Sequence, residues 1–442
     1  MREWSRILLL SLLAGQLAPP AAALEVPLEY VRYPDEEDVD GPFVVYGEAH
    51  LEGSGTLPAG DWKLPELKSE QPLYLLAALG DGEVLLVLDR ERADDPFFSR
   101  LLCDANANRD LTDDPAVAVG GGLPLPGLFE TAPIDLRLSA AGGTMPYSFR
   151  FVAWSEEMLE GGELGDDVKP EELTFLLKSN CCYLGRFEEG QQTYRILLGD
   201  ANANGRFDDT ASFLRLTEEN AHHALKLEGD RFFLTSDEEI GEHDATVLGS
   251  RVTLGGRVFD LAVDAVSSKL TLTPNTGALA TLQLPVELER LTLETQESGE
   301  FVMLYRPGRE AKVPPGSYRV AGYQLYRQDD QGDLWCLWGS ATRQTAFVEV
   351  DPAQVTTLEF GEPFLSVGAV PEKTYQASKP LERVPVEFHI EGVARELVTE
   401  LKHVSGDRTR TPLDETRSRP LEPTYIILMG SQIVARGAFE YG

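Results

Sequence analysis

The chain has 442 residues and a formal net charge of −34 at neutral pH, because 73 acidic residues outnumber 39 basic ones. Such an acidic surface repels nucleic acid and anionic membranes and attracts divalent cations, so nucleic-acid binding is excluded as a function class. The length allows roughly three or four domains. The 4 cysteines are too few in a chain this long for a disulfide-based fold.

The first residues have the order of a secretory signal peptide. Arg2 and Arg6 form a basic stretch, and residues 7–17 are mostly apolar but too few to span a bilayer. Small alanines close the segment, so residues 1–23 are predicted to be removed and the mature chain to begin at Leu24. A buried N-terminal helix or strand is the alternative. No later segment is long and apolar enough for a transmembrane helix, and we expect a secreted or periplasmic protein.

Residues 24–155 are predicted to form a first β unit. Its apolar, β-branched and aromatic runs are separated by Gly, Pro, Asn and Asp, which is typical of short strands joined by turns. A hairpin at residues 74–88 precedes an acidic loop at residues 104–114. Two strands are expected after the loop, at residues 134–138 and 147–151.

Residues 156–272 repeat this order of elements. A hairpin at residues 183–198 precedes a second acidic loop at residues 200–209, and strands are expected at residues 247–254 and 258–263. The repetition indicates a duplication rather than a solenoid, because only two copies are present. The sequence leaves open whether the two units share one core.

The rest of the chain is predicted to form two β-sandwich modules. In residues 273–365, the segment Val-Pro-Pro-Gly-Ser-Tyr-Arg-Val at 313–320 resembles the turn of transthyretin-like and carboxypeptidase-regulatory-like sandwiches. The resemblance covers eight residues and implies a small sandwich for binding, spacing or stability, with an inward-facing Tyr and no chemistry of its own. Residues 366–442 are expected to form an Ig-like sandwich, with an alternating strand at 384–390 and a closing hairpin at 424–437.

Two copies of one acidic segment are the most informative feature of the sequence. Asp-Ala-Asn-Ala-Asn occupies residues 104–108 and, 96 residues later (200 − 104), residues 200–204. Oxygen-bearing side chains at alternate positions suit a hard cation such as Ca²⁺, which takes six to eight oxygen ligands. The chain therefore predicts up to two Ca²⁺ sites.

The second copy resembles the first half of an EF-hand or dockerin calcium loop. In those loops the side chains at positions 1, 3 and 5 and the carbonyl at position 7 wrap the ion, and glycine at position 6 permits a sharp turn, as Gly205 would here. At position 12 Ala211 replaces the usual bidentate Glu, and the flanks are strand-like rather than helical. The resemblance implies these ligands: Asp200, Asn202, Asn204, the Arg206 carbonyl, and Asp208 or Asp209.

The first copy departs further from the pattern. Arg109 replaces the turn glycine and Pro115 stands at position 12. A left-handed conformation at Arg109 would cost about 1 kcal/mol or more. Asx-rich turns without a metal are the alternative for both copies, since Asn and Asp cap their own backbone. The ligands implied for this loop are Asp104, Asn106, Asn108, the Asp110 carbonyl, and Asp113 or Asp114.

The cysteines leave two interpretations open. Cys181 and Cys182 are neighbours that would point to opposite faces of a strand, so they are a poor pair. If a disulfide forms, we expect Cys103 to bond with one of these two. The alternative is free, buried thiols, which would also apply to Cys336.

Standard catalytic patterns are absent: the sequence has no nucleophile elbow, no zinc-binding helix and no Walker loop. Trp335 and Trp338 could stack on a sugar, but a spacing of three places them on different faces of a strand. We expect an exported, calcium-stabilised protein with a non-catalytic binding, adhesion or structural role, whose partner is a protein or a glycan. The alternative is a secreted hydrolase, of glycoside hydrolase or peptidase type, whose active site the sequence does not reveal.

Overall fold

The structure, a computed structural model, describes residues 22–33, 47–95, 98–118, 129–154, 173–214, 224–241, 244–330, 332–369, 387–404 and 424–438. The described residues form strands and no α-helix, which confirms the predicted all-β fold. None of them forms a helix long and apolar enough to cross a membrane. Most of the predicted signal peptide lies outside these ranges.

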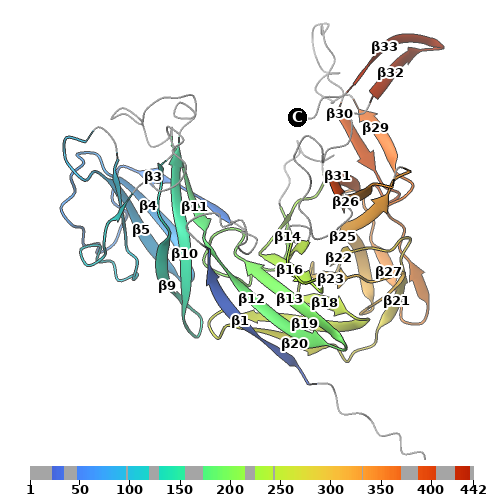
Figure 1. The fold of residues 1–442 in the computed structure, drawn as a ribbon, viewed down its shortest axis with the longest axis horizontal. Coiled ribbons are helices and arrows are strands. Elements are labelled where there is room, and N and C mark those ends of the chain that lie inside the picture. Colours follow the sequence, from blue (N-terminus) through green and yellow to red (C-terminus); the bar gives the residue numbers. More distant parts are fainter. Residues whose placement is uncertain are drawn as a thin grey trace, which may run out of the picture.

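Two five-stranded sheets pack together in the lobe drawn in blue and teal in Figure 1. The first sheet is ordered β2 (Glu48–Leu51), β11 (Thr174–Ser179), β10 (Gly143–Trp154) and β8 (Phe129–Glu130), with β9 (Ile134–Ala140) also paired to β10. The second sheet is ordered β3 (Gly53–Ser54), β4 (Leu73–Leu79), β5 (Gly82–Asp89), β6 (Arg100–Cys103) and β7 (Val117–Ala118).

Strand β5 is covered on both faces because apolar side chains fill every position from residue 84 to 88. Successive side chains of a strand point to opposite faces. Leu86 and Leu88 therefore join the large cluster between the two sheets, whereas Leu85 and Val87 join a smaller cluster on the outer face. An uninterrupted apolar run thus produces a central strand buried on both sides.

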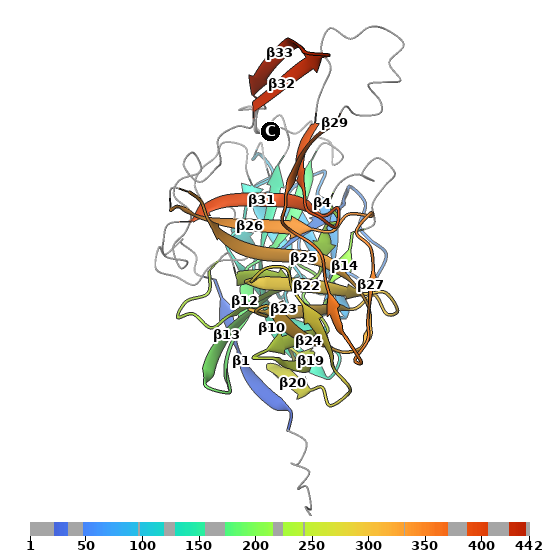
Figure 2. The ribbon, with the colours of Figure 1, turned by 90° about the vertical axis from the view of Figure 1, so that its right-hand side faces the viewer.

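A sixteen-stranded sheet forms the body of the molecule (Figures 1 and 2). Its order is β17 (Ala245–Val247), β16 (Arg231–Thr235), β13 (Gln192–Gly199), β12 (Cys181–Glu189), β1 (Leu24–Arg32), β20 (Lys269–Pro274), β19 (Arg257–Asp264), β18 (Arg251–Leu254), β23 (Phe301–Tyr305), β22 (Arg290–Thr295), β25 (Gly316–Gln328), β26 (Leu334–Ser340), β31 (Leu397–Val404), β30 (Glu387–Glu391) and β29 (Leu365–Ala369), with β27 (Val348–Val350) paired to β25.

The long sheet curls, so that its β16–β17 end packs against β22 and β23. Ion pairs join the β16–β17 end to β22 and β23. Arg290 Nη2 lies 2.5 Å from Asp244 Oδ1, and Arg306 Nη2 lies 2.9 Å from Asp237 Oδ2. The smaller elements are β14 (Ser212–Phe213) with β15 (Leu227–Glu228), β21 (Ala280–Gln283) with β24 (Glu310–Val313) and β28 (Val355–Thr357), and β32 (Thr424–Met429) with β33 (Gln432–Ala438).

The two predicted units, residues 24–155 and 156–272, exchange strands across their boundary. Strand β1 pairs with β12 and β20 in the long sheet, although its residues belong to the first unit. Strand β11 pairs with β10 and β2 in the first lobe, although its residues belong to the second. Both units also contribute to the largest buried cluster, so they share one core. The unit boundaries themselves stay predictions.

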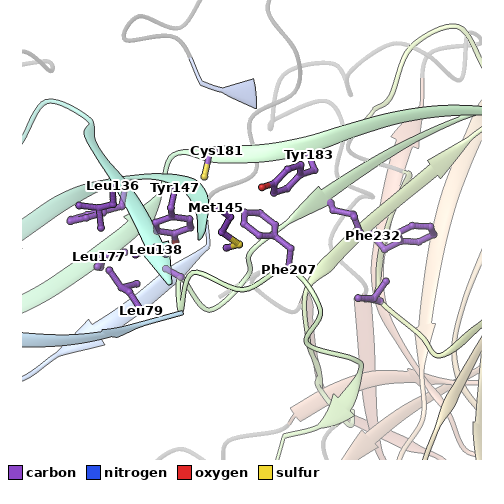
Figure 3. Packing of buried hydrophobic residues seen from close by; sticks show 14 of the residues in the cluster. Leu79, Leu136, Leu138, Met145, Tyr147, Leu177, Cys181, Tyr183, Phe207 and Phe232 are labelled. Atoms are coloured by element: carbon purple, nitrogen blue, oxygen red, sulfur yellow. The ribbon is translucent and has the colours of Figure 1, made fainter. Parts of the chain in front are cut away.

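Aromatic rings fill the junction between the lobe and the long sheet (Figure 3). Phe207, just beyond the acidic segment of the second loop, packs edge-on against Tyr183 with ring centroids 4.9 Å apart and against Tyr147 at 6.3 Å. Tyr183 belongs to β12 and Tyr147 to β10, so one side chain of the loop contacts both parts of the molecule.

The third predicted unit has its own core between β22 and β25 on one side and β21, β24 and β28 on the other. Tyr318, in the turn segment at residues 313–320, is 1% exposed, and its hydroxyl donates to the Pro314 carbonyl at 2.8 Å. The inward-facing Tyr is thus confirmed. The described strands of residues 365–404 extend the long sheet beyond β26, and the predicted closing hairpin is confirmed as β32 and β33.

All four cysteines are free and buried, so the structure contains no bridge from Cys103 to Cys181 or Cys182. Burial raises the pKa of every thiol, to about 12 for Cys182 and Cys336. A thiol held in its protonated form by burial is a poor nucleophile.

We therefore expect none of the four thiols to react with a thiol reagent in the native protein at neutral pH, and all four to react in denaturant. A colorimetric thiol titration of the mature protein, with and without guanidinium, measures both numbers. Fewer than four reactive thiols in denaturant without reductant would reveal a disulfide and contradict this arrangement.

Candidate functional site

Each acidic loop begins directly where a buried strand ends. Asp104 follows β6 and Asp200 follows β13, and both side chains are fully buried. A buried carboxylate requires hydrogen-bond donors, and in both cases the loop itself provides them. The loop therefore starts where the apolar strand ends, and its backbone amides turn toward the buried carboxylate.

The second loop wraps the Asp200 carboxylate. Oδ1 accepts a hydrogen bond from the Asn204 amide at 3.2 Å, and Oδ2 accepts one from the Gly205 amide at 2.7 Å. The Tyr147 hydroxyl donates to Oδ2 at 2.8 Å. The side-chain oxygens of Asn202 and Asn204 accept from backbone amides two residues ahead, at 3.2 and 2.8 Å. Alternate side-chain oxygens thus organise the whole turn.

The first loop repeats this pattern. Asp104 accepts from the amides of Asn108 at 3.0 Å and Arg109 at 3.1 Å, and Asn106 Oδ1 accepts from the Asn108 amide at 3.0 Å. Positions 4 and 6 have left-handed backbones in both copies. The corresponding φ angles are 55° at Ala107 and 65° at Arg109, and 49° at Ala203 and 76° at Gly205. The left-handed conformation considered for Arg109 is therefore present.

A buried apolar residue anchors the end of each turn. Leu111 and Phe207 both stand seven residues after the first aspartate, and each is 1% exposed. The next shared position is the carboxylate nine residues after the first aspartate, at Asp113 and Asp209. Asn108 Nδ2 donates to Asp113 at 3.0 Å. The backbone turns and most of the hydrogen bonds of the two loops thus correspond from the first aspartate to this carboxylate.

Asp209 lies over the middle of the second loop. Its Oδ2 accepts from Asn202 Nδ2 at 3.0 Å and from Asn204 Nδ2 at 2.6 Å. Asp208, by contrast, is exposed to solvent. In the first loop the Asp110 side chain accepts from Lys63 Nζ at 2.7 Å. Of the two closing carboxylates left open for the second loop, the structure brings only Asp209 onto the asparagines.

Asp230 is a site residue that the sequence did not reveal. It is fully buried just before β16, and it accepts from the Ala201 amide at 3.1 Å and from the Asp209 amide at 2.8 Å. In the first loop the equivalent bond is made by Asp114, which accepts from the Ala105 amide at 3.2 Å. Asp114 stands 10 residues after Asp104, whereas Asp230 stands 30 residues after Asp200 (230 − 200). The pairing of β13 with β16 brings Asp230 to the second loop.

Burial controls the charge of this site. It raises the pKa of Asp200 to about 6, and burial together with repulsion from Asp200 raises the pKa of Asp230 to about 9. Neither carboxylate forms an ion pair with any residue that the structure describes. A buried negative charge without a cationic partner is costly, so each carboxylate favours its protonated form or a bound cation.

The oxygen atoms of the loops are mixed in type. Among the described residues, no three acidic, histidine or cysteine side chains form a group able to hold a metal ion. Each loop instead combines one or two carboxylates with amide and carbonyl oxygens, which are also Ca²⁺ ligands. The same side-chain-to-backbone bonds are those of Asx turns, so this hydrogen bonding is compatible with either interpretation.

The second loop also joins the lobe to the long sheet. The Asn204 carbonyl accepts from the Gly80 amide at 2.8 Å, and the Ala201 carbonyl accepts from the Glu48 amide at 3.1 Å. The Ser179 hydroxyl donates to the Asp200 carbonyl at 3.1 Å. These three donors belong to three different segments of the first lobe. The loop thus stands at the contact between the two parts of the molecule.

Comparison of the chain with protein families, curated proteins and solved structures finds no match. Function must therefore be argued from this chain alone.

The raised pKa values predict how stability depends on pH without calcium. The pKa of an aspartate is ordinarily 3.8, and in the folded state it is about 6 for Asp200 and about 9 for Asp230. At pH values between the ordinary and the raised pKa, the folded state therefore binds more protons than the unfolded state. The free energy of unfolding should therefore fall as pH rises through this window. Asp110, whose pKa is lowered to about 2, titrates below it.

Melting in a chelator at about pH 5.5 and pH 8 measures this slope for the loop-bearing transition. The Asp230→Asn variant is the matched control, because it keeps the shape of the side chain and removes its titration. We expect a smaller slope in this variant. A slope that the substitution leaves unchanged would show that Asp230 is not its source.

The turn geometry of the second loop predicts a cost for a side chain at Gly205. A Cβ there would lie 2.4 Å from Leu138 Cδ1 and 3.0 Å from the Gly80 amide nitrogen, in a backbone with φ 76°. Gly190 has a similar φ of 64° with open space around it. Gly190→Ala should therefore cost only the conformational term of about 1 kcal/mol, and Gly205→Ala should cost more. Equal losses in urea unfolding would contradict the packing at this turn.

Proposed function

We propose that this protein is an exported β protein whose two acidic loops bind Ca²⁺, and that its role is non-catalytic: binding, adhesion or structural. One observation carries the proposal. The carboxylates of Asp200 and Asp230 are fully buried near each other, with no ion pair to a described residue, at the contact between the two parts of the molecule. The N-terminal order of basic, apolar and small residues supports export.

A bound cation would relieve the cost of this burial. Without one, Asp230 retains its proton at neutral pH, because its pKa is about 9. A divalent ion in the loop would favour the charged forms of Asp200 and Asp209, and it would compensate Asp230 behind them. The oxygens available to it are those of Asp200, Asn202, Asn204, the Arg206 carbonyl and Asp209.

The affinity should be modest. Neutral Asn oxygens replace carboxylates at two positions, and Ala211 stands where a bidentate Glu would close an EF-hand. Such a site belongs with the weak extracellular calcium modules, where dissociation constants reach about 10⁻⁴–10⁻³ M. Calcium would then act as a structural ion in a calcium-rich medium rather than as an intracellular signal.

The position of the second loop gives calcium a structural task. Its backbone carbonyls accept hydrogen bonds from the amides of Gly80 and Glu48, and its Phe207 packs between Tyr147 and Tyr183. An ion that fixes the loop would therefore fix the lobe against the long sheet. The buried carboxylates cannot reach a substrate in this arrangement, so they give no support to a hydrolase.

Calcium should raise the stability of the loop-bearing part. At about 100 times Kd, one site adds about 2.7 kcal/mol. Asp200→Ala should remove most of the calcium-dependent shift in melting temperature, and Asp104→Ala should remove less, because the first loop is more exposed and contains Arg109 in a left-handed conformation. Calorimetry in millimolar calcium and in chelator measures the shift.

Asp330→Ala is the matched control for these variants, since it removes an exposed carboxylate from a remote turn. It should leave the calcium shift unchanged. Identical melting curves of the wild type in calcium and in chelator would reject calcium binding and leave two Asx turns.

A further inference from the structure

A hollow of about 390 Å³ lies where the β16–β17 end of the curled sheet faces β22, β25 and β26. Its floor is formed by β22, β25 and β26, and the edge strand β17 and residues 224–227 flank it. The side chains that give it chemical character are Lys226, Arg231, Arg290, Thr292, Gln324 and Trp338. Its volume is in the range of pockets that hold one small ligand.

The floor follows from the register of three strands. Arg290 of β22, Gln324 of β25 and Trp338 of β26 form one cross-strand row. Side chains in such a row share one face of the sheet. Leu291 and Leu337, at neighbouring positions, point to the opposite face and join the core of the third unit. The floor is thus a polar and aromatic face backed by a packed core.

The wall at residues 224–227 is tied to the floor. The Leu225 amide donates to the Ala341 carbonyl at 2.7 Å, and the Ser340 hydroxyl donates to the Leu225 carbonyl at 2.7 Å. Leu227 also pairs with Phe213 in the β14–β15 ribbon. Hydrogen bonds therefore fix this wall both to the end of β26 and to β14.

The charged side chains that line it are all basic, although the protein as a whole is acidic. Arg290 is already paired, with Asp244 at 2.5 Å and with Gln324 Oε1 at 3.1 Å. Lys226 and Arg231 are exposed and form no ion pair or hydrogen bond through their side chains with the described residues. Two cations at one hollow that have no ion pair among the described residues, in a chain with 73 acidic and 39 basic residues, mark a place for an anion.

The floor adds a surface for a ring. Trp338 is half-buried, and the Lys402 ammonium lies 5.8 Å from its ring centroid. An aromatic side chain provides a flat apolar surface, and the Thr292 hydroxyl beside it can hydrogen-bond with a hydroxyl group. A simple inorganic anion would use none of these features. A sugar ring that carries a carboxylate would use all of them.

We propose that this hollow binds an acidic saccharide, with Arg231 and Lys226 facing its carboxylate and Trp338 against its ring. The inference rests on the proposed binding role, and it names the class of ligand. It does not depend on calcium, because none of the residues that carry it belongs to the acidic loops.

The test is isothermal titration of the full mature protein, in millimolar calcium, with an oligosaccharide of uronic acids. The neutral oligosaccharide of the same length and inorganic phosphate are titrated in parallel. We expect the uronic acid oligomer alone to bind. Equal binding of the neutral sugar would overturn recognition of the carboxylate. Equal binding of phosphate would overturn recognition of the ring, and no binding of any probe would overturn the site.

Two pairs of variants locate the binding. Arg231→Ala and Trp338→Ala should each weaken it by about tenfold or more. Arg186→Ala removes an exposed arginine elsewhere, and Trp335→Ala removes the tryptophan on the other face of β26, so both should bind as the wild type does. Arg231→Lys retains the charge and should retain most of the affinity. Equal losses in the control variants would reject this hollow as the site.

The melting temperature of each variant shows that it is folded. Calcium-dependent melting without saccharide binding would leave the proposed calcium role standing and remove only this inference. Saccharide binding without calcium-dependent melting would do the reverse.

Discussion

The burial of Asp200 is the constraint on which the arrangement of this molecule depends. A carboxylate cannot be buried without donors, and the donors come from its own loop, from Gly205 and Asn204, and from Tyr147 of the neighbouring lobe. Forming the loop and docking the lobe are therefore one event. Asp230 adds a second buried carboxylate, so the same junction has a negative charge that a proton or a cation must relieve.

The exchange of strands strengthens the same junction. Strand β1 enters the long sheet between β12 and β20, and β11 joins the lobe beside β10. The two parts are therefore connected through the chain in both directions, and their common cluster includes Tyr147, Tyr183 and Phe207. Two parts that exchange strands cannot separate without losing core, which explains why one loop can have structural consequences for both.

Local features were predictable from the sequence, because they depend on neighbouring residues. Patterns a few residues long predicted the period of the strands, the inward-facing Tyr318 and the closing hairpin. Asp230 was not predictable, since it reaches the second loop only through the pairing of β13 with β16. Nothing local distinguishes it from the many other acidic residues of the chain. The hollow at Arg231 escaped prediction for the same reason, because its walls come from distant segments.

The central claim is that the loops hold calcium, and counting the bound ions tests it most directly. Equilibrium dialysis of the mature protein against radioactive calcium, at a free concentration well above the expected dissociation constant, measures ions per chain. The account predicts two ions for the wild type, one for Asp200→Ala and two for Asp330→Ala. A chain that binds no calcium, or whose calcium survives the loss of both Asp104 and Asp200, would contradict it.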